Sequence, residues 1–340
     1  MRPTIAITMG DPAGIGPEIA VKALNYEHIF HRCIPVVIGD MAAISDALTF
    51  TGSPLKINRI ADVDETSGSP GVIDLIDLGL LEKGSWEYKK VSPVCGKAAY
   101  AYIEKAINLA LDKKVHAVVT GPINKESLNK AGYHYSGHTE IFAKLTGTSK
   151  YAMLLSTEKL KVIHVTTHVS LRKACDLITR ERVLDVIHLA DSAMKTLGYA
   201  RPKIAVAGLN PHSSEGGLFG NEEAQSIIPA VSEAKSEGID VEGPVPPDTV
   251  FVKALAGQYD IVVAMYHDQG HIPIKLLGFN LDSGTGTFTS LNGVNCTVGL
   301  PIIRTSVDHG TAFEIAGEGK ANETSLIDAI DMAVRMVKTK

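Results

Sequence analysis

The sequence lacks the features of three large classes of protein. No apolar run approaches the roughly 20 residues that span a bilayer, and the apolar stretch after Met1 is too short for a signal peptide. The 33 Lys and Arg residues are scattered along the chain and are outnumbered by 38 Asp and Glu residues, so no basic stripe for nucleic acid is present. We therefore expect a cytoplasmic protein that binds neither membranes nor nucleic acid.

Cysteine is scarce and widely spaced. The four residues form no C-x-x-C pair; they are Cys33, Cys95, Cys175 and Cys296. A disulfide framework or a cysteine metal site would need closer and more regular spacing. We interpret the cysteines as reduced, packed thiols, with a metal or redox role as the weaker alternative.

The usual nucleotide-binding loops are also missing. Residues 10–18 read GDPAGIGPE, a tight glycine turn with Pro17 at the expected start of a helix and Glu18 in its first turn. The segment lacks the third glycine of G-x-G-x-x-G and the lysine of a Walker A motif. A dinucleotide or nucleoside triphosphate site is therefore not expected at this loop.

What the sequence does have is an alternation of strand and helix patterns. Apolar runs rich in Val, Ile and Ala predict strands at 4–8, 35–38, 116–120, 153–156, 162–166, 203–207 and 261–265, and amphipathic patterns predict helices at 98–111 and 179–197. Runs of this kind are typical of strands buried on both faces of a parallel sheet. We predict an α/β fold.

The domain organisation is less sharply marked than the strands. The 340 residues are enough for two domains or one large α/β unit. No Pro/Ser-rich linker divides them, so we expect two domains that share a sheet or exchange strands. Residues 282–290 alternate Thr with Gly, Phe and Ser, which predicts a hairpin-like excursion.

Histidine follows three of the predicted strands. His168 comes after strand 162–166, His212 after 203–207, and His267 after 261–265. Because the carboxyl ends of parallel strands meet at one edge of a sheet, these imidazoles can converge. Three neutral imidazoles suit a divalent transition metal and leave open positions for substrate. The alternative is that each is an ordinary loop or core histidine, as we expect for His164 inside its strand.

Charged side chains that could serve such a site are present nearby. Asp248 and Asp268 could accept the second ring N–H of a ligating imidazole. Lys275 and Arg304 are the cations best placed for a phosphate or carboxylate, with Arg304 able to bind it through two nitrogens. For Lys275, an ordinary surface role is an equal alternative.

Two further segments could bind ligand. In Gly137-His138-Thr139-Glu140, Thr139 could cap the following helix or bind an anion at its N-terminus. The run 309–322 contains three glycines and small residues that would let the backbone approach a flat ligand, which His309 and Asn322 could contact. The alternative for each segment is a plain capping or tight loop. Asn124-Lys125, after strand 116–120, could likewise reach a polar ligand or cap a helix.

Five motifs occur in order over nearly the whole chain: GDPAGIGPE at 10–18, GHTE at 137–140, NPH at 210–212, YHDQG at 266–270 and RTSVDHGTA at 304–312. Together they resemble the 4-hydroxythreonine-4-phosphate dehydrogenase family. Segments 151–153, 161–165, 246–251 and 270–279 look closest to the branch that acts on 4-phospho-D-threonate and D-erythronate. The excursion 281–291 is longer than the resemblance leads us to expect.

The resemblance implies a fold like that of isocitrate and isopropylmalate dehydrogenases, with two α/β domains around a cleft. We expect residues 1–135 with 305–340 in the first domain, and 136–304 in the second, with the metal ligands and the dimer interface. It also implies a homodimer with a shared active site. By motif match, the metal ligands are His168, His212 and His267, the substrate contacts are His138, Thr139, Lys275, Asn295 and Arg304, and the NAD contacts are His309, Gly310, Thr311, Ala312 and Asn322.

The implied activity is oxidation, with decarboxylation, of a four-carbon phosphorylated hydroxy acid by NAD and one divalent metal ion per subunit. The favoured substrate is 4-phospho-D-threonate or D-erythronate, which would give dihydroxyacetone phosphate and carbon dioxide. The alternative is 4-phosphooxy-L-threonine, for pyridoxal phosphate synthesis. A metal-dependent hydrolase or acyltransferase is the rival class. The metal can be Zn, Co, Ni, Mn or Mg, and Asp248, Asp268 and Lys275 are the candidate catalytic residues, with Lys125 another candidate base.

Overall fold

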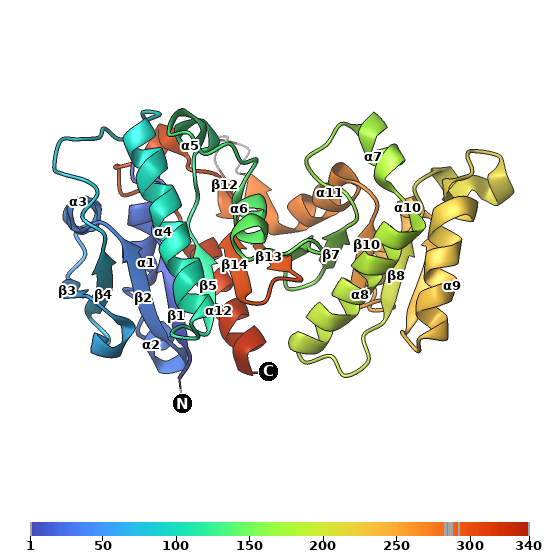
Figure 1. Cartoon of the computed structure of the whole chain (residues 1–340), viewed down its shortest axis with the longest axis horizontal. Helices are drawn as coiled ribbons and strands as arrows, with labels where there is room; N and C mark the ends of the chain where they lie inside the picture. The colour runs from blue at the N-terminus through green and yellow to red at the C-terminus, as the bar shows by residue number, and fades with distance from the viewer. Residues whose placement is uncertain (1, 282–283, 285–287, 292, 339–340) are drawn as a thin grey trace. The chain divides into compact units, whose positions relative to one another are not determined.

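The computed structural model describes residues 2–281, 284, 288–291 and 293–338. The chain forms two compact units (Figure 1). Unit 1 contains residues 1–148, 290–294 and 300–338, and unit 2 contains residues 149–289 and 295–299. Residues 136–148, 290–294 and 300–304, which we expect from the resemblance in the second domain, are part of unit 1.

Unit 1 is built on parallel strands. Their order is β3 (Lys56–Ile60), β4 (Val72–Asp77), β2 (Ile34–Gly39), β1 (Thr4–Thr8), β5 (Ala117–Thr120) and β14 (Ile303–Val307). The helices of this unit are α1 (Gly16–Ala23), α2 (Glu27–Arg32), α3 (Met41–Thr51), α4 (Pro93–Leu111), α5 (Lys125–Lys130), α6 (His138–Leu145) and α12 (Thr324–Lys338). Helix α4 packs on β1, β2 and β5, and α12 packs on β5 and β14, so the strands between are buried.

Unit 2 has a second run of strands. Their order is β13 (Val294–Val298), β6 (Ala152–Ser156), β7 (Lys161–His164), β10 (Ile261–Ala264), β8 (Ile204–Ala207) and β9 (Val241–Val245). Strands β7, β10, β8 and β9 are parallel, but β6 pairs with β7 in the antiparallel sense. The chain between β6 and β7 is too short for a parallel crossover, and the N–H of Thr157 closes the turn on the carbonyl of Leu160. The expectation of a parallel sheet therefore does not hold at β6.

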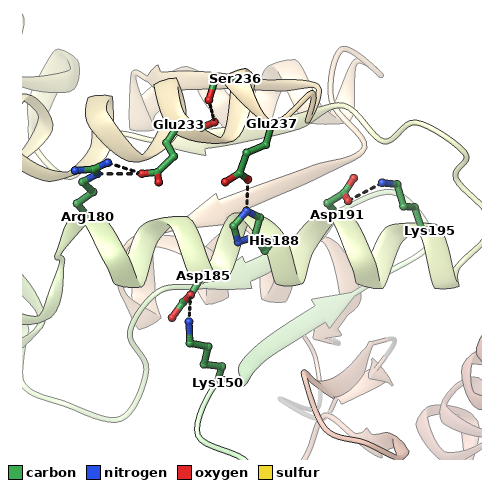
Figure 2. Close-up of polar contacts among 9 residues, drawn as sticks. All are labelled: Lys150, Arg180, Asp185, His188, Asp191, Lys195, Glu233, Ser236 and Glu237. Atoms are coloured by element: carbon green, nitrogen blue, oxygen red, sulfur yellow. Dashed lines mark hydrogen bonds and ion pairs between the residues drawn. The ribbon is translucent and has the colours of Figure 1, made fainter.

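The helices of unit 2 are α7 (Leu171–Leu177), α8 (Arg180–Thr196), α9 (Ile228–Ser236), α10 (Pro247–Leu255) and α11 (His267–Gly278). Figure 2 shows polar side chains joining α8 to α9 and its C-terminal end. Arg180 donates to one carboxylate oxygen of Glu233 through both Nε (3.1 Å) and Nη2 (2.7 Å), and His188 pairs with Glu237. These contacts are exposed, so they add little stability beyond the apolar packing beneath them.

The seven predicted strands and both predicted helices are present, with boundaries that differ by a few residues at most, and the α/β fold class is confirmed. Strands β11 (Phe279–Leu281) and β12 (Phe288–Leu291) pair in a separate two-stranded sheet, as the predicted hairpin requires. Residues 282–283 and 285–287 of that excursion lie outside the described residues.

The cysteines are packed inside the fold as thiols. Three cysteines are buried, the fourth, Cys175, is partly buried, and none of the four forms a disulfide. The interpretation as packed thiols is therefore confirmed. No helix in the described part of the chain has the length and apolarity to span a membrane.

Candidate active site

The carboxyl ends of three adjacent strands in unit 2 carry the histidines. Because β10 lies between β7 and β8 and is parallel to both, the loops that follow these strands leave from one edge. The rings of His168 and His267 are 5.8 Å apart between centroids. Both line a cavity of 380 Å³, together with Thr167, Ser170 and Tyr266. The structure thus brings together two of the three predicted metal ligands.

His267 is held by two neighbours. Its Nδ1 is 2.7 Å from Oδ1 of Asp268, so Nε2 is the nitrogen that a metal would use. The ring of His271 stacks on it with centroids 3.6 Å apart, and Nδ1 of His271 donates to the carbonyl of His267 at 3.0 Å. These contacts fix the ring plane of His267.

Two more imidazoles continue this row into the core. His271 lies 4.8 Å from the ring of His164, which is completely buried. Burial, then the neighbouring His271, lower the pKa of His164 to about 3, and burial, then His267, lower the pKa of His271 to about 4. Both rings are therefore neutral at physiological pH. The interpretation of His164 as a packed residue is confirmed.

His212 has a different environment. It lies in the segment 211–217, where His212 to Glu215 adopt left-handed backbone angles with φ of 51°, 53°, 64° and 44°. Its Nδ1 is 2.8 Å from Oε2 of Glu215, and this hydrogen bond raises the pKa of His212. The side chain is 63% exposed and does not line the cavity of His168 and His267.

The fit of the histidines to a metal is therefore partial. The donor chemistry is suitable, since the Nδ1 atoms of His212 and His267 both face carboxylates and leave Nε2 for a ligand. The positions are not, since no three His, Cys, Asp or Glu side chains of the described residues are placed to hold one ion. The three-histidine site stays a prediction.

The predicted catalytic residues also lie in unit 2. Asp248, in the first turn of α10, and Asp268 line a second cavity, of 340 Å³, which they share with Tyr266 and Phe251. Lys275 lies in the last turn of α11, with Nζ 4.0 Å from the ring centroid of Phe279. The two carboxylates are thus brought together, while Lys275 lines neither of these cavities.

In unit 1, two of the predicted substrate contacts are buried and a third, His138, is half-buried. Arg304, in β14, is 2% exposed; its Nη2 donates to Oγ1 of Thr120 at 2.7 Å, and its guanidinium lies 5.5 Å from the ring centroid of Phe142. Thr139, at the start of α6, is 8% exposed. Burial, followed by the positive charges of Arg304 and Lys125, lowers the pKa of His138 well below its usual value. This group combines a neutral imidazole with two cations, a composition that favours an anion.

Two other sequence-based candidates behave differently. Asn295 lies in β13, and its Oδ1 is buried without a hydrogen-bond partner among the described residues. Buried amide oxygens of proteins usually accept a hydrogen bond, so this oxygen is compatible with the predicted contact to substrate. Asn124 instead caps α5, since its Oδ1 accepts the N–H of Ser127 at 2.8 Å. For Asn124 the structure favours the capping alternative.

The predicted cofactor segment forms a loop on unit 1. His309 donates through Nδ1 to the carbonyl of Gly310 at 3.0 Å, and Ala312 has a left-handed φ of 41°. Oδ1 of Asn322 accepts the N–H of Thr324 at 2.8 Å, just where α12 begins. A Cβ on Gly310 would meet no atom within 4 Å, so this backbone is open to a flat ligand. The NAD contacts of this segment stay a prediction.

The GDPAGIGPE loop has no such opening. A Cβ on Gly16 would lie 2.0 Å from the carbonyl oxygen of Met9, and residues 9–20 are buried throughout. That this loop is not a nucleotide site stays a prediction. Sequence reasoning missed the role of His271, although its i+4 spacing from His267 puts both on one face of a helix.

The chain matches the family model described as "Pyridoxal phosphate biosynthetic protein PdxA" over residues 31–333. The chain belongs to this PdxA family.

Relatives of PdxA type cover nearly the whole chain. A "D-threonate 4-phosphate dehydrogenase" of Salmonella typhimurium is 50% identical, covering 98% of this chain and 98% of its own. One of Cupriavidus necator with the same name is 49% identical, covering 96% and 95%. The crystal structure of a "4-hydroxythreonine-4-phosphate dehydrogenase" from Klebsiella pneumoniae has a TM-score of 0.87 and 47% identity, covering 99% and 98%. The resemblance expected from the motifs is confirmed.

Proposed function

We propose that the chain oxidises 4-phospho-D-threonate, or the related D-erythronate, with NAD, and that loop 309–322 binds the adenosine part of NAD. As a member of the PdxA family it is a dehydrogenase that acts on a CH–OH group. The observation that carries the substrate proposal is near-complete coverage, at 49% and 50% identity, by relatives named for D-threonate 4-phosphate. Oxidation at C3 gives a 3-oxo acid, and loss of carbon dioxide from it yields dihydroxyacetone phosphate.

In unit 1, the group formed by Arg304, Thr139 and His138 supplies the positive charge that binds a phosphorylated hydroxy acid. Arg304 can donate two parallel hydrogen bonds to a phosphate or carboxylate, and Thr139 can add its hydroxyl. Neutral His138 can donate or accept at Nε2, which is buried and has no hydrogen-bond partner among the described residues. Because these side chains are already ordered, little entropy is lost when they orient the substrate.

For unit 2 we propose that His168 and His267, joined by His212, bind one divalent metal ion. This requires segment 211–217 to rearrange, because His212 lies outside the cavity of the other two. A bound ion would lower the pKa of the substrate hydroxyl and polarise the carbonyl that forms. Asp248 and Asp268, which line one cavity, are the candidates to take up the hydroxyl proton, while Lys275 would balance substrate charge.

We also propose a homodimer that uses the outer face of α10 and α11. Val252, Ile272 and Leu276 are 66%, 58% and 78% exposed there, and an apolar patch of this kind usually marks an interface. Sedimentation or light scattering should give twice the chain mass, and Leu276→Asp should shift it toward the monomer. A monomeric wild-type protein would contradict this part of the proposal.

The substrate is tested by comparing kcat/KM, from NADH formation, for 4-phospho-D-threonate, 4-phospho-D-erythronate and 4-phosphooxy-L-threonine. The first should be the best substrate. A clear preference for 4-phosphooxy-L-threonine, the substrate class named by the Klebsiella structure, would replace our proposal with that alternative.

A further inference from the structure

The GDPAGIGPE motif packs against the beginning of loop 309–322. The N–H of Ile15 donates to the carbonyl of Thr311 at 3.0 Å. A Cβ on Gly14 would lie 2.8 Å from Cβ and 2.9 Å from the carbonyl oxygen of the same Thr311. Only glycine permits this approach, so the motif and the loop are fitted to each other.

The helix that follows the motif holds the other end of the loop. Glu18 is completely buried, and its Oε1 accepts the N–H of Ala321 at 2.6 Å. One turn later, Nζ of Lys22 donates to the carbonyls of Gly319 at 2.8 Å and Ala321 at 2.7 Å. Lys22 also lies 3.3 Å from Oε1 of Glu18. A buried carboxylate is costly unless it is paired, and here its partners are a lysine and the loop backbone.

The middle of the loop is held by a third element. Nζ of Lys89 donates to the carbonyl of Glu314 at 3.0 Å and pairs with the carboxylate of Glu318. A Cβ on Gly317 would lie 3.0 Å from the ring of Tyr88, so the loop rests directly on that ring. The loop backbone is therefore fixed at its start, middle and end.

We propose that Glu18 and Lys22 are positioning residues for the nicotinamide cofactor, which hold residues 319–321 in the shape that binds its adenosine part. This inference rests on the proposed role of loop 309–322 in binding NAD. Both residues act through the loop backbone. Glu18 and Lys22 together form a clamp on the loop backbone. Gly310 and Asn322 of the same loop are exposed, so this clamp fixes the shape of the loop without covering these residues.

The test compares Lys22→Met with Lys130→Met. Lys130 forms the same i,i+4 pair with a glutamate, Glu126, but makes no hydrogen bond or ion pair with the described residues of the loop, so it is a matched control within unit 1. Loss of two charge-assisted hydrogen bonds should weaken NADH binding, measured by its fluorescence without substrate, about tenfold. The KM for NAD should rise by the same factor, while kcat and the substrate KM change less than about twofold. Lys130→Met should change none of these.

Conservative variants provide the second arm. Glu18→Gln keeps an oxygen that can accept the Ala321 N–H, so it should bind NADH more tightly than Glu18→Ala, and it keeps the test open if Lys22→Met does not fold. Equal changes in kcat and both KM values, with a lower melting temperature, would mean a structural role only and would overturn the inference.

The role of the loop itself is tested separately with His309→Ala and Asn322→Ala. If neither weakens NADH binding, the loop does not bind the cofactor and that part of the proposed function fails. If they weaken it while folded Lys22→Met does not, the cofactor site stands and the clamp inference is overturned.

Discussion

The candidate residues of unit 1 and unit 2 differ in how firmly the fold holds them. Arg304 and Thr139 of unit 1 are 2% and 8% exposed and lie among packed strands and helices. In unit 2, the side chains of His212 and Asp268 are 63% and 73% exposed. Each forms one contact between an imidazole and a carboxylate, His212 with Glu215 and Asp268 with His267. Under our proposal, unit 1 presents a preformed anion-binding group, whereas the unit 2 residues gain their final geometry from the ligand. This difference predicts how variants in each unit behave.

The largest effect should come from unit 1. Arg304→Ala removes a buried cation, so kcat/KM for the phosphorylated substrate should fall at least about a hundredfold, with the KM for NAD little changed. Arg304→Lys should recover only part of this loss, because an ammonium cannot form two parallel hydrogen bonds. Arg59→Ala of the same unit, whose side chain is 66% exposed and pairs with Asp77, is the control. A selective rise in the KM for NAD would contradict the assignment.

The next effect concerns metal binding in unit 2. His267→Ala should remove measurable Mn²⁺ binding in calorimetry, and dialysis against a chelator should lower wild-type activity. Asp268→Asn should weaken Mn²⁺ binding only about tenfold, since it orients the imidazole without touching the ion. The control is Asp191→Asn on α8, where the carboxylate pairs with Lys195 (Figure 2). Tight Mn²⁺ binding by His267→Ala would remove the metal site from this region.

A smaller effect is expected from Asp11, a buried carboxyl group of unit 1. Burial raises the pKa of Asp11 to about 6 from 3.8, despite the N–H of Ala13 on its Oδ1. The folded state therefore favours the protonated acid, and this residue makes the fold less stable as pH rises from about 4 through 6. Asp11→Asn should remove that loss, so its stability relative to wild type should improve by about 1 kcal/mol between about pH 5 and pH 8 in urea unfolding. A pH-independent difference would show that Asp11 is charged in the fold.

The smallest effect is expected on the surface of unit 2. Arg180→Ala, Glu233→Ala and the double variant should give a coupling free energy of about 0.5 kcal/mol or less, screened by salt. The activity of these variants should be unchanged, because neither Arg180 nor Glu233 lines either of the two cavities of unit 2. A coupling several times larger would mean that the contacts in Figure 2 help to hold α9 in place.

The sequence predicts seven of the fourteen strands that the described residues form from uninterrupted apolar runs, which leave little choice. It does not predict β3, β4, β9, β13 or β14, because charged or polar residues interrupt the apolar pattern of these strands. In β14, Arg304, Thr305 and Ser306 are all buried, against the usual preference of such residues. The candidate substrate contact Arg304 thus interrupts the apolar pattern of the strand that positions it.

The candidate site was predictable to a similar degree. Strand order follows from topology, so His168 and His267 could be expected to meet. The left-handed backbone of residues 212–215 and the contact between His212 and Glu215 depend on local packing, which no periodicity reveals. The clamp of Glu18 and Lys22 joins residues about 300 positions apart, and a single sequence gives no sign of it.

The place of β14 in unit 1 has a consequence for how the protein is made. Strand β5 pairs with β14, and α12 packs on both, yet some 180 residues of chain, mostly those of unit 2, are synthesised between them. While the ribosome is still making unit 2, the first 148 residues have an open strand edge at β5, which is an aggregation hazard. All described strands of unit 2 precede residue 303, so unit 2 can complete them before β14 is made. A chain that ends before residue 303 leaves β5 without its partner strand, although the first 148 residues are all present.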